Sequence, residues 1–451
     1  MGPIGQRQVL HLAWPFMVSM LSQTAMTLAD TLFVARLGTA PLAGIGLGSV
    51  ASYVLLAAGF GLTGGVRVLV AQATGGQRTE QVRVLAWQAL WITLALGLLG
   101  LLLVPLSAWV VALFGASGEV AAHATDYLWI RVAGSGPAVA MLALAAWFQG
   151  RGDTRTPMVA NVLANLLNIA LDPPFIFGSG PLPALGVAGA AVTTVVAQCV
   201  GTAILAAAAW PVLRRTSARP RLDLLRRMMQ VGAPMALRGV LSVAGFAVFV
   251  ALLARAGDAH LGAHVVVMRI VSVSFLPGHA IGEASGVLAG QALGAGRADL
   301  ARQAFWAGTR LASLVMGAMA LLFVALPRPL LAIFDPSPEV ADIAVRLMLI
   351  GAAFQLFDAV AMVAQGVLNG VGDTRFTLLA GVGTMWLVNL PLGWLLGLHL
   401  GMGATGAWLA LTAEIIVFAA VTLLRIRGSG WLDQGMARVA EDERLAAVGA
   451  C

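Results

Sequence analysis

The chain has 451 residues, of which 59% are hydrophobic and 10% are charged, and its formal net charge is +7. Soluble globular proteins average about 25% charged residues, so this composition excludes a soluble globular fold. The positive charge lies mainly in segments that flank long apolar stretches. Contact with anionic lipid accounts for it there, and nucleic-acid binding is not expected.

Long apolar stretches follow one another along the whole chain, each long enough to cross about 30 Å of hydrocarbon as a helix. The first, at 10–35, is too long for a cleavable signal peptide and lacks a small-residue cleavage site, so we expect it to remain as a span. We predict twelve spans, at residues 10–35, 44–71, 84–104, 122–148, 157–177, 186–212, 228–255, 262–291, 303–325, 341–368, 376–398 and 404–426. The expected fold class is an all-α polytopic membrane protein.

The predicted spans divide the chain into two halves of six. We expect an N-lobe at 1–213, an Arg-rich cytoplasmic linker at 214–227, a C-lobe at 228–427 and a cytoplasmic tail at 428–451. An even number of spans gives both lobes the same orientation in the membrane. The prediction is therefore two pseudo-symmetric six-helix lobes around a central cleft.

The two halves also repeat each other's sequence. The repeated pairs are GRGDTR at 150–155 with GVGDTR at 370–375, AQATGGQR at 71–78 with GQALGAGR at 290–297, and Pro15 with Pro234. Internal repeats in so apolar a chain are typical of transporters whose lobes move around a site between them. The GDTR loops are interpreted as structural, with glycine making a tight turn, aspartate capping the next helix and arginine anchoring at the headgroups.

Arginine indicates the topology, because the chain contains no lysine and positive loops favour the cytoplasm. The loops on one side, together with both ends of the chain, carry most of the arginines. We therefore expect a multi-pass protein of the cytoplasmic (inner) membrane with both termini in the cytoplasm. Cys199 lies in a predicted span and Cys451 at the terminus, so no disulfide is expected between them.

Two aspartates are predicted at similar depth in the N-lobe. Asp30 lies about 18 residues, and Asp172 about 15 residues, from the cytoplasmic start of its span. Asn168 is one helical turn before Asp172, and Gln23 lies on the same helix face as Asp30. A charge at the bilayer centre costs about 2.5–3.5 kcal/mol on insertion scales. Carboxylates and amides gathered there indicate a site for a proton or for Na⁺; satisfaction by hydrogen bonds at the outer interface is the structural alternative.

The predicted C-lobe spans carry a different polar set. Arg238 and Glu283 lie at similar depth near the cytoplasmic side, where a salt bridge between them is geometrically reasonable, and His279 is one turn from Glu283. Asp358 and Glu414 lie near the middle of the tenth and twelfth spans. These five residues are candidates for substrate binding or gating, and the alternative is that they only hold helices together.

Motifs for enzymatic chemistry are absent from the sequence. It contains no Walker motif, no HExxH, no metal-type Cys/His cluster and no nucleophile elbow. We therefore expect neither an enzyme nor a cofactor, and no metal beyond a candidate Na⁺ at Asp30 and Asp172.

Several segments together resemble the multidrug and toxic compound extrusion (MATE) transporters along nearly the full length. They are PFMVSMLSQTAMTLADTLFVARLG at 15–38, GVRVLVAQATG at 65–75, VLAGQALGAGR at 287–297, QGRGDTRTP at 149–157, NGVGDTRFT at 369–377 and NIALDPPFIFG at 168–178. The last segment is similar to the fifth-span motif of prokaryotic members. The resemblance is to the DinF-like subfamily.

The resemblance implies secondary active efflux of cationic, amphiphilic compounds, driven by inward H⁺ or Na⁺. In the DinF-like subfamily the aspartates of spans 1 and 5 bind the coupling ion, and by motif match these are Asp30 and Asp172. NorM-like members carry a glutamate about ten residues after the proline of span 7, where this chain has Ala244. A NorM-type Na⁺ site in the C-lobe is therefore in doubt, although Asp358 remains.

Other classes of membrane protein remain as alternatives. A flippase for lipid-linked precursors or lipids, of the related MOP superfamily, would need a more cationic cleft, whereas this chain offers Arg238 alone. A structural or receptor protein explains neither the buried carboxylates nor the duplication. The expected partners are small cationic or amphiphilic substrates and membrane lipids, and a monomer is expected.

Overall fold

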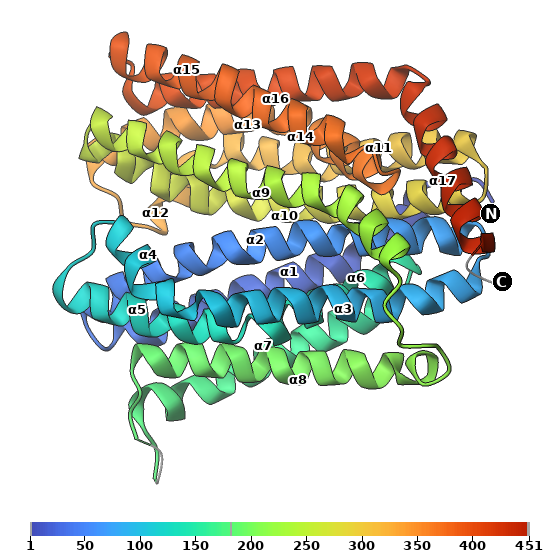
Figure 1. Ribbon diagram of the computed structural model, residues 1–451. Coiled ribbons are helices and arrows are strands. Elements are labelled where there is room, and N and C mark those ends of the chain that lie inside the picture. Colours follow the sequence, from blue (N-terminus) through green and yellow to red (C-terminus); the bar gives the residue numbers. More distant parts are fainter. Residues whose placement is uncertain (1, 181–182, 449–451) are drawn as a thin grey trace. The chain divides into compact units, whose positions relative to one another are not determined.

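The structure, a computed structural model, describes residues 2–180 and 183–448. Cys451 lies outside the described residues, and Cys199 is unpaired and exposed. The first half forms the helices α1 (Gln6–Ala35), α2 (Thr39–Gly75), α3 (Thr79–Leu103), η1 (Val104–Leu106), α4 (Ser107–Leu113), α5 (Gly118–Ala133), α6 (Ser135–Gly150), α7 (Arg155–Phe177) and α8 (Val187–Leu213) (Figure 1).

The second half repeats this series of helices with more interruptions near its end. Its helices are α9 (Leu222–Ala256), α10 (Asp258–Gly294), α11 (Ala298–Ala325), α12 (Pro327–Ala332), α13 (Pro338–Gly370), α14 (Thr374–Thr384), η2 (Met385–Asn389), α15 (Leu390–Gly393), η3 (Trp394–His399), α16 (Gly403–Arg427) and α17 (Gly430–Val448). The segments η2 and η3 are π-helical. Such stretches often mark functional positions within helices.

The helices agree with the predicted spans. Ten of the described helices are long and apolar enough to cross a membrane, and the pair α5 and α6, bent by 51°, makes an eleventh. Helix α1, with 30 residues, matches the remaining predicted span; Gln23, Thr27 and Asp30 make it more polar than the others. The expected all-α polytopic fold class is confirmed.

The boundaries differ from the prediction at three places. The fourth span is not straight, because α5 and α6 meet at Gly134 with a bend of 51°. The third span continues through η1 into α4. The chain also forms an additional helix, α17, after the twelfth span, and it covers one end of α10 and α16 (Figure 1). Trp431 of α17 is fully buried and donates to the carbonyl of Ile426 at 3.0 Å, so this helix is docked onto its neighbours.

Two compact units divide the described chain. One comprises residues 15–74 and 78–236, and the other the first fourteen residues, 75–77 and the chain from Leu237 onward. Helix α1 changes unit between Trp14 and Pro15, and α9 changes unit two residues after Pro234. The prolines that the sequence repeat pairs therefore stand where a helix passes from one unit to the other.

Within the first unit, α3, α6, α7 and α8 pack around a core of small and aromatic side chains. Trp147 of α6 is fully buried in this core and donates to the carbonyl of Val82 on α3 at 2.8 Å. Helices α7 and α8 lie side by side (Figure 1). This pairing matters for function, because both helices carry polar side chains that face each other.

Within the second unit, α10 and α13 approach closely through glycines. A Cβ at Gly366 would lie 2.1 Å from the carbonyl oxygen of Gly282, and one at Gly286 would lie 2.3 Å from that of Gly366. Small residues at four-residue spacing let membrane helices bring their backbones together. The glycines of this part of the repeat therefore serve helix packing.

The two GDTR loops share a glycine in the left-handed region. Gly152 and Gly372 have φ of 86° and 85°, values that favour glycine. The aspartates that follow them differ. Asp153 accepts from the backbone N–H of Thr156 at 3.0 Å and so caps α7, as expected. Asp373 makes no side-chain cap to α14 and instead pairs with Arg425 at 2.9 Å, so the predicted cap is wrong in the second loop.

Candidate functional site

The two predicted N-lobe aspartates come together in the first unit. Asp30 on α1 is 6% exposed and Asp172 on α7 is 0% exposed. The two carboxyl groups lie close enough to interact with each other. Ionised carboxylates repel each other and only accept hydrogen bonds, so this proximity favours a proton or a cation at the pair.

Asn168 connects the pair to α8. With its amide oriented so that the nitrogen faces Asp30, Asn168 donates to Oδ1 of Asp30 at 2.9 Å and accepts from the backbone N–H of Thr194 at 3.2 Å. The opposite orientation would face the amide oxygen toward the carboxylate oxygen, so the network selects the first. Asn168 therefore contacts Asp30, and it lies one helical turn before Asp172 on α7.

Thr193, which the sequence analysis did not single out, contacts Asp172 directly. Its hydroxyl oxygen lies 2.5 Å from Oδ1 of Asp172 and 2.9 Å from the carbonyl oxygen of Ala190. A hydroxyl has one hydrogen to donate. If Thr193 gives it to Ala190, the short contact to Asp172 is satisfied by a proton on the carboxyl group. Among the described residues, none donates a hydrogen bond to Oδ2 of Asp172.

The proline pair after Asp172 leaves the helix intact. Helix α7 continues through Pro173 and Pro174 to Phe177. Because prolines have no N–H, the carbonyls of Ile169 and Ala170 lose their usual helical donors. These carbonyl oxygens stand within one turn of Asp172.

Two further polar side chains, Asn165 and Gln23, lie on the helices that carry the aspartates. Asn165 donates to the hydroxyl of Ser22 at 2.8 Å and thereby joins α7 to α1. Gln23 is exposed, and its amide contacts Sδ of Met26 at 3.8 Å. The hydrogen bonds of the aspartate centre therefore come from Asn168 and Thr193, and Gln23 lies apart from them.

A buried arginine was missed by the sequence analysis. Arg131 on α5 is 9% exposed and donates from Nη1 to Oε1 of Gln198 at 3.0 Å. It is close enough to Asp30 for an electrostatic interaction. It lies three residues before the bend at Gly134, where α5 meets α6.

The C-lobe candidates form a second polar cluster in the other unit. Arg238 on α9 interacts electrostatically with Glu414 on α16, and Glu414 does so with Asp358 on α13. Glu414 also accepts from Thr384 at 3.2 Å, and Asn389 in η2 lies close enough to interact with it. The structure thus brings together three of the five predicted residues, with the π-helical segment beside them.

Arg238 has a different partner from the one considered from sequence. Its Nη2 donates to Oε1 of Gln365 at 2.5 Å, and its guanidinium lies 5.4 Å from the ring centre of Phe418. His279 and Glu283 instead approach each other on α10, at 3.9 Å. The pairing of His279 with Glu283 is present, whereas the salt bridge between Arg238 and Glu283 is not formed.

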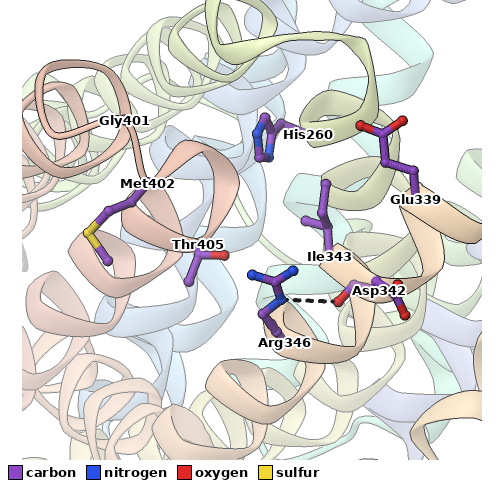
Figure 2. A pocket seen from close by; sticks show the side chains of 8 residues that line it. All are labelled: His260, Glu339, Asp342, Ile343, Arg346, Gly401, Met402 and Thr405. Atoms are coloured by element: carbon purple, nitrogen blue, oxygen red, sulfur yellow. Dashed lines mark hydrogen bonds between the residues drawn. The ribbon is translucent and has the colours of Figure 1, made fainter.

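A pocket of about 510 Å³ opens elsewhere in the second unit, at the Pro338 end of α13. Figure 2 shows its lining by His260, Glu339, Asp342, Ile343, Arg346, Gly401, Met402 and Thr405. Nδ1 of His260 accepts from the backbone N–H of Ala404 at 3.2 Å, and Nε of Arg346 donates to the carbonyl of Asp342 at 3.4 Å. The charged side chains here are exposed, and none of the predicted site residues lines this pocket.

Comparison with known protein families identifies the family of this chain. The family model described as MatE matches twice, at residues 15–173 and 234–395, so that the two matches begin at the paired prolines. The chain belongs to the MatE family. The double match also confirms the internal duplication, because each half satisfies the same model.

Similar proteins cover almost the whole of this MatE-family chain. It is 30% identical over 435 residues to the "Probable multidrug resistance protein NorM" of Thermotoga maritima, covering 94% of this chain and 93% of that protein. It is 33% identical over 419 residues to the protein of the same name from Deinococcus radiodurans, covering 91% and 92%.

Solved structures share the fold. A MATE transporter of the MOP superfamily in an outward-facing conformation superimposes with a TM-score of 0.86 at 22% identity, covering 97% of both chains. A MATE structure in the bent conformation gives 0.87 at 22% identity, covering 96% of both chains. These likenesses confirm the expected MATE fold.

Proposed function

We propose that this protein is a secondary active multidrug transporter that exports cationic, amphiphilic compounds in exchange for inward H⁺ or Na⁺, by alternating access. The Asp30–Asp172 pair is the coupling site. The observation that carries the proposal is the proximity of two buried carboxyl groups, which favours the binding of a proton or a cation. The names of the NorM relatives support the multidrug class of substrate.

Ion binding at this site competes with charge repulsion. When both carboxyl groups are ionised and close, their repulsion favours an arrangement that separates α1 from α7, and a bound proton or Na⁺ favours the arrangement in which they meet. An ion therefore changes the populations of two arrangements of the first unit, which is what coupling to transport requires.

The C-lobe cluster is proposed to receive the substrate. Asp358 and Glu414 supply two carboxylates against the single guanidinium of Arg238, an arrangement that favours a cation. His279 and Glu283, paired on α10, are assigned to gating. Asp358→Asn is expected to raise the half-saturating concentration of a cationic dye severalfold while leaving the dependence on the driving ion unchanged. An altered ion dependence with unchanged dye affinity would contradict this assignment.

The setting proposed for the transporter is the cytoplasmic (inner) membrane, with both termini in the cytoplasm. The arginine-rich loops favour this orientation. The proposal involves a monomer, membrane lipids, no enzymatic step, no nucleic acid and no cofactor apart from the coupling ion.

Transport of ethidium in proteoliposomes tests the function. A pH gradient and a Na⁺ gradient are imposed separately on the reconstituted protein, and dye movement is followed by fluorescence. One of the gradients is expected to drive accumulation above that of empty liposomes. A protein that ignores both gradients but moves a fluorescent lipid across the bilayer would instead be a MOP-superfamily flippase.

A further inference from the structure

Arg131 stands out as a buried cation in the first unit. Its guanidinium is held from one side by Gln198, at 3.0 Å, and among the described residues its Nε has no hydrogen-bond partner. Placing a charged group in a membrane interior is costly unless something offsets it. A single amide oxygen offsets little of this cost, so the surroundings must supply negative charge.

The layering of the helices places Arg131 level with the aspartates. One apolar cluster contains Val34, Ile176, Tyr127 and Ala190. Each lies four residues, about one helical turn, from a polar residue on its own helix: Asp30, Asp172, Arg131 and Thr194, respectively. The apolar cluster therefore covers one side of a polar layer to which α1, α5, α7 and α8 all contribute.

Few ionisable side chains other than the aspartate pair lie on the helices around Arg131. Helix α8, which packs against α5, has no acidic or basic side chain, and neither do α6 and α4. The other ionisable groups are Arg7 and His11 on α1 and Arg36 just after it, Tyr53 and Arg67 on α2, Glu80 and Arg83 in the first turns of α3, Arg155 at the start of α7, and Glu119, His123, Asp126 and Tyr127 on α5 itself. Of these α5 groups, Asp126 is exposed and Tyr127 lies within the apolar cluster.

We propose that Arg131 is a built-in counter-cation of the Asp30–Asp172 pair, so that one bound proton or one Na⁺ leaves the site neutral. Two carboxylates and one guanidinium carry one net negative charge, which a single monovalent ion cancels. Without Arg131, two monovalent ions would be needed to neutralise the two carboxylates. This inference rests on the proposed coupling role of the pair, and it gives Arg131 the part of a positioning residue that sets how many ions the site takes up and how tightly.

A purely structural role for Arg131 would have a different consequence. If Arg131 only holds α5 against α8 through its hydrogen bond to Gln198, its loss lowers transport at every pH by the same factor. A counter-cation acts on ion affinity instead. At an effective dielectric constant of about 20, a unit charge acting over roughly 10 Å changes a titration midpoint by about one pH unit. Removing the positive charge of Arg131 shifts the midpoint toward alkaline pH because the ionised pair loses a stabilising neighbour.

The test compares ethidium transport as a function of pH, or of Na⁺ concentration if Na⁺ drives the protein, in four reconstituted variants. Arg131→Gln should move the half-maximal point by about one pH unit to the alkaline side, or lower the half-saturating Na⁺ about tenfold. Arg131→Lys should remain within a few tenths of a unit of wild type, because it keeps the charge. Gln198→Leu should reduce the transport rate with a much smaller shift of the half-maximal point, because it removes only the hydrogen bond between α5 and α8.

Gln198→Glu keeps the test decisive if Arg131→Gln does not fold. The new carboxylate is isosteric with the amide, retains the hydrogen bond and cancels the charge of Arg131, so the alkaline shift should appear in this variant too. An unmoved midpoint in the charge-removing variants, or an equal shift in Arg131→Lys, would overturn the inference. Wild-type protein that responds to no ion gradient would instead overturn the proposed function.

Discussion

Thr193 on α8 reaches Asp172 on α7 with an oxygen–oxygen distance of 2.5 Å. The contact links the fully buried carboxyl group to the helix that also holds Asn168 through the backbone of Thr194. Hydrogen bonds that involve a carboxyl group are short and strong. Helix α8 thus orients both members of the pair, although it carries no charge of its own.

Replacing Thr193 tests this orientation. Thr193→Val keeps the shape but removes the hydroxyl, so we expect ion-driven dye transport to fall about tenfold, the equivalent of one hydrogen bond to a carboxyl group at about 1.5 kcal/mol. Thr193→Ser should retain most of the activity. Thr202→Val is the matched control on the same helix, since Thr202 donates to the carbonyl of Pro137 at 2.9 Å. An equal loss in both valine variants would show that the effect is only structural.

The glycines between α10 and α13 give a prediction on stability. Gly366→Ala would place a Cβ 2.1 Å from the carbonyl oxygen of Gly282, so the helices must separate, at a cost of about 2 kcal/mol or more. Thermal unfolding in detergent should show a clear decrease in Tm.

Gly383→Ala is the control for this substitution. A Cβ there would meet no described atom within 4 Å, and alanine in a helix gains up to about 1 kcal/mol over glycine. Its Tm should be unchanged or higher. A Tm for Gly366→Ala as high as that of Gly383→Ala would contradict the close packing.

The Asp373–Arg425 pair is expected to hold the second GDTR loop. The Asp373 side chain is 4% exposed, so Arg425→Ala would leave a buried charge without its partner, at a cost of about 3 kcal/mol. The double variant Arg425→Ala/Asp373→Asn should recover part of the lost Tm. Arg297→Ala is the control, because its pair with Asp299 is exposed and should contribute nothing measurable. Similar Tm values for Arg425→Ala and Arg297→Ala would contradict the role of the loop anchor.

Much of the fold could be predicted because the length of the apolar stretches and the sequence repeat between the two halves are strong signals. Each predicted span corresponds to a described helix or to a bent pair of helices, and Pro15 and Pro234 begin the two family matches. Asp30, Asp172 and Asn168 could be found because a carboxylate in hydrocarbon is costly and helical spacing places Asn168 beside Asp172.

The rest depends on contacts between distant segments. Arg131 is buried on α5 and donates to Gln198 of α8, a helix that begins more than fifty residues later in the chain. Thr193 looked like an ordinary helix residue until α8 was placed beside α7. The identical GDTR loops diverge because Arg425 comes from α16, more than fifty residues later in the chain. None of these arrangements has a local sequence signal.

Coupling of ion movement to export by the Asp30–Asp172 pair can be tested by comparing two variants. Ethidium accumulation in proteoliposomes is measured for Asp30→Asn and for Asp126→Asn, an exposed carboxylate of the same unit, under the gradient that drives wild type. Ethidium binding is measured in parallel. Asp30→Asn should bind the dye but no longer respond to the ion, whereas Asp126→Asn should behave as wild type. Ion-driven accumulation by Asp30→Asn at the wild-type rate would show that the pair does not couple the two movements.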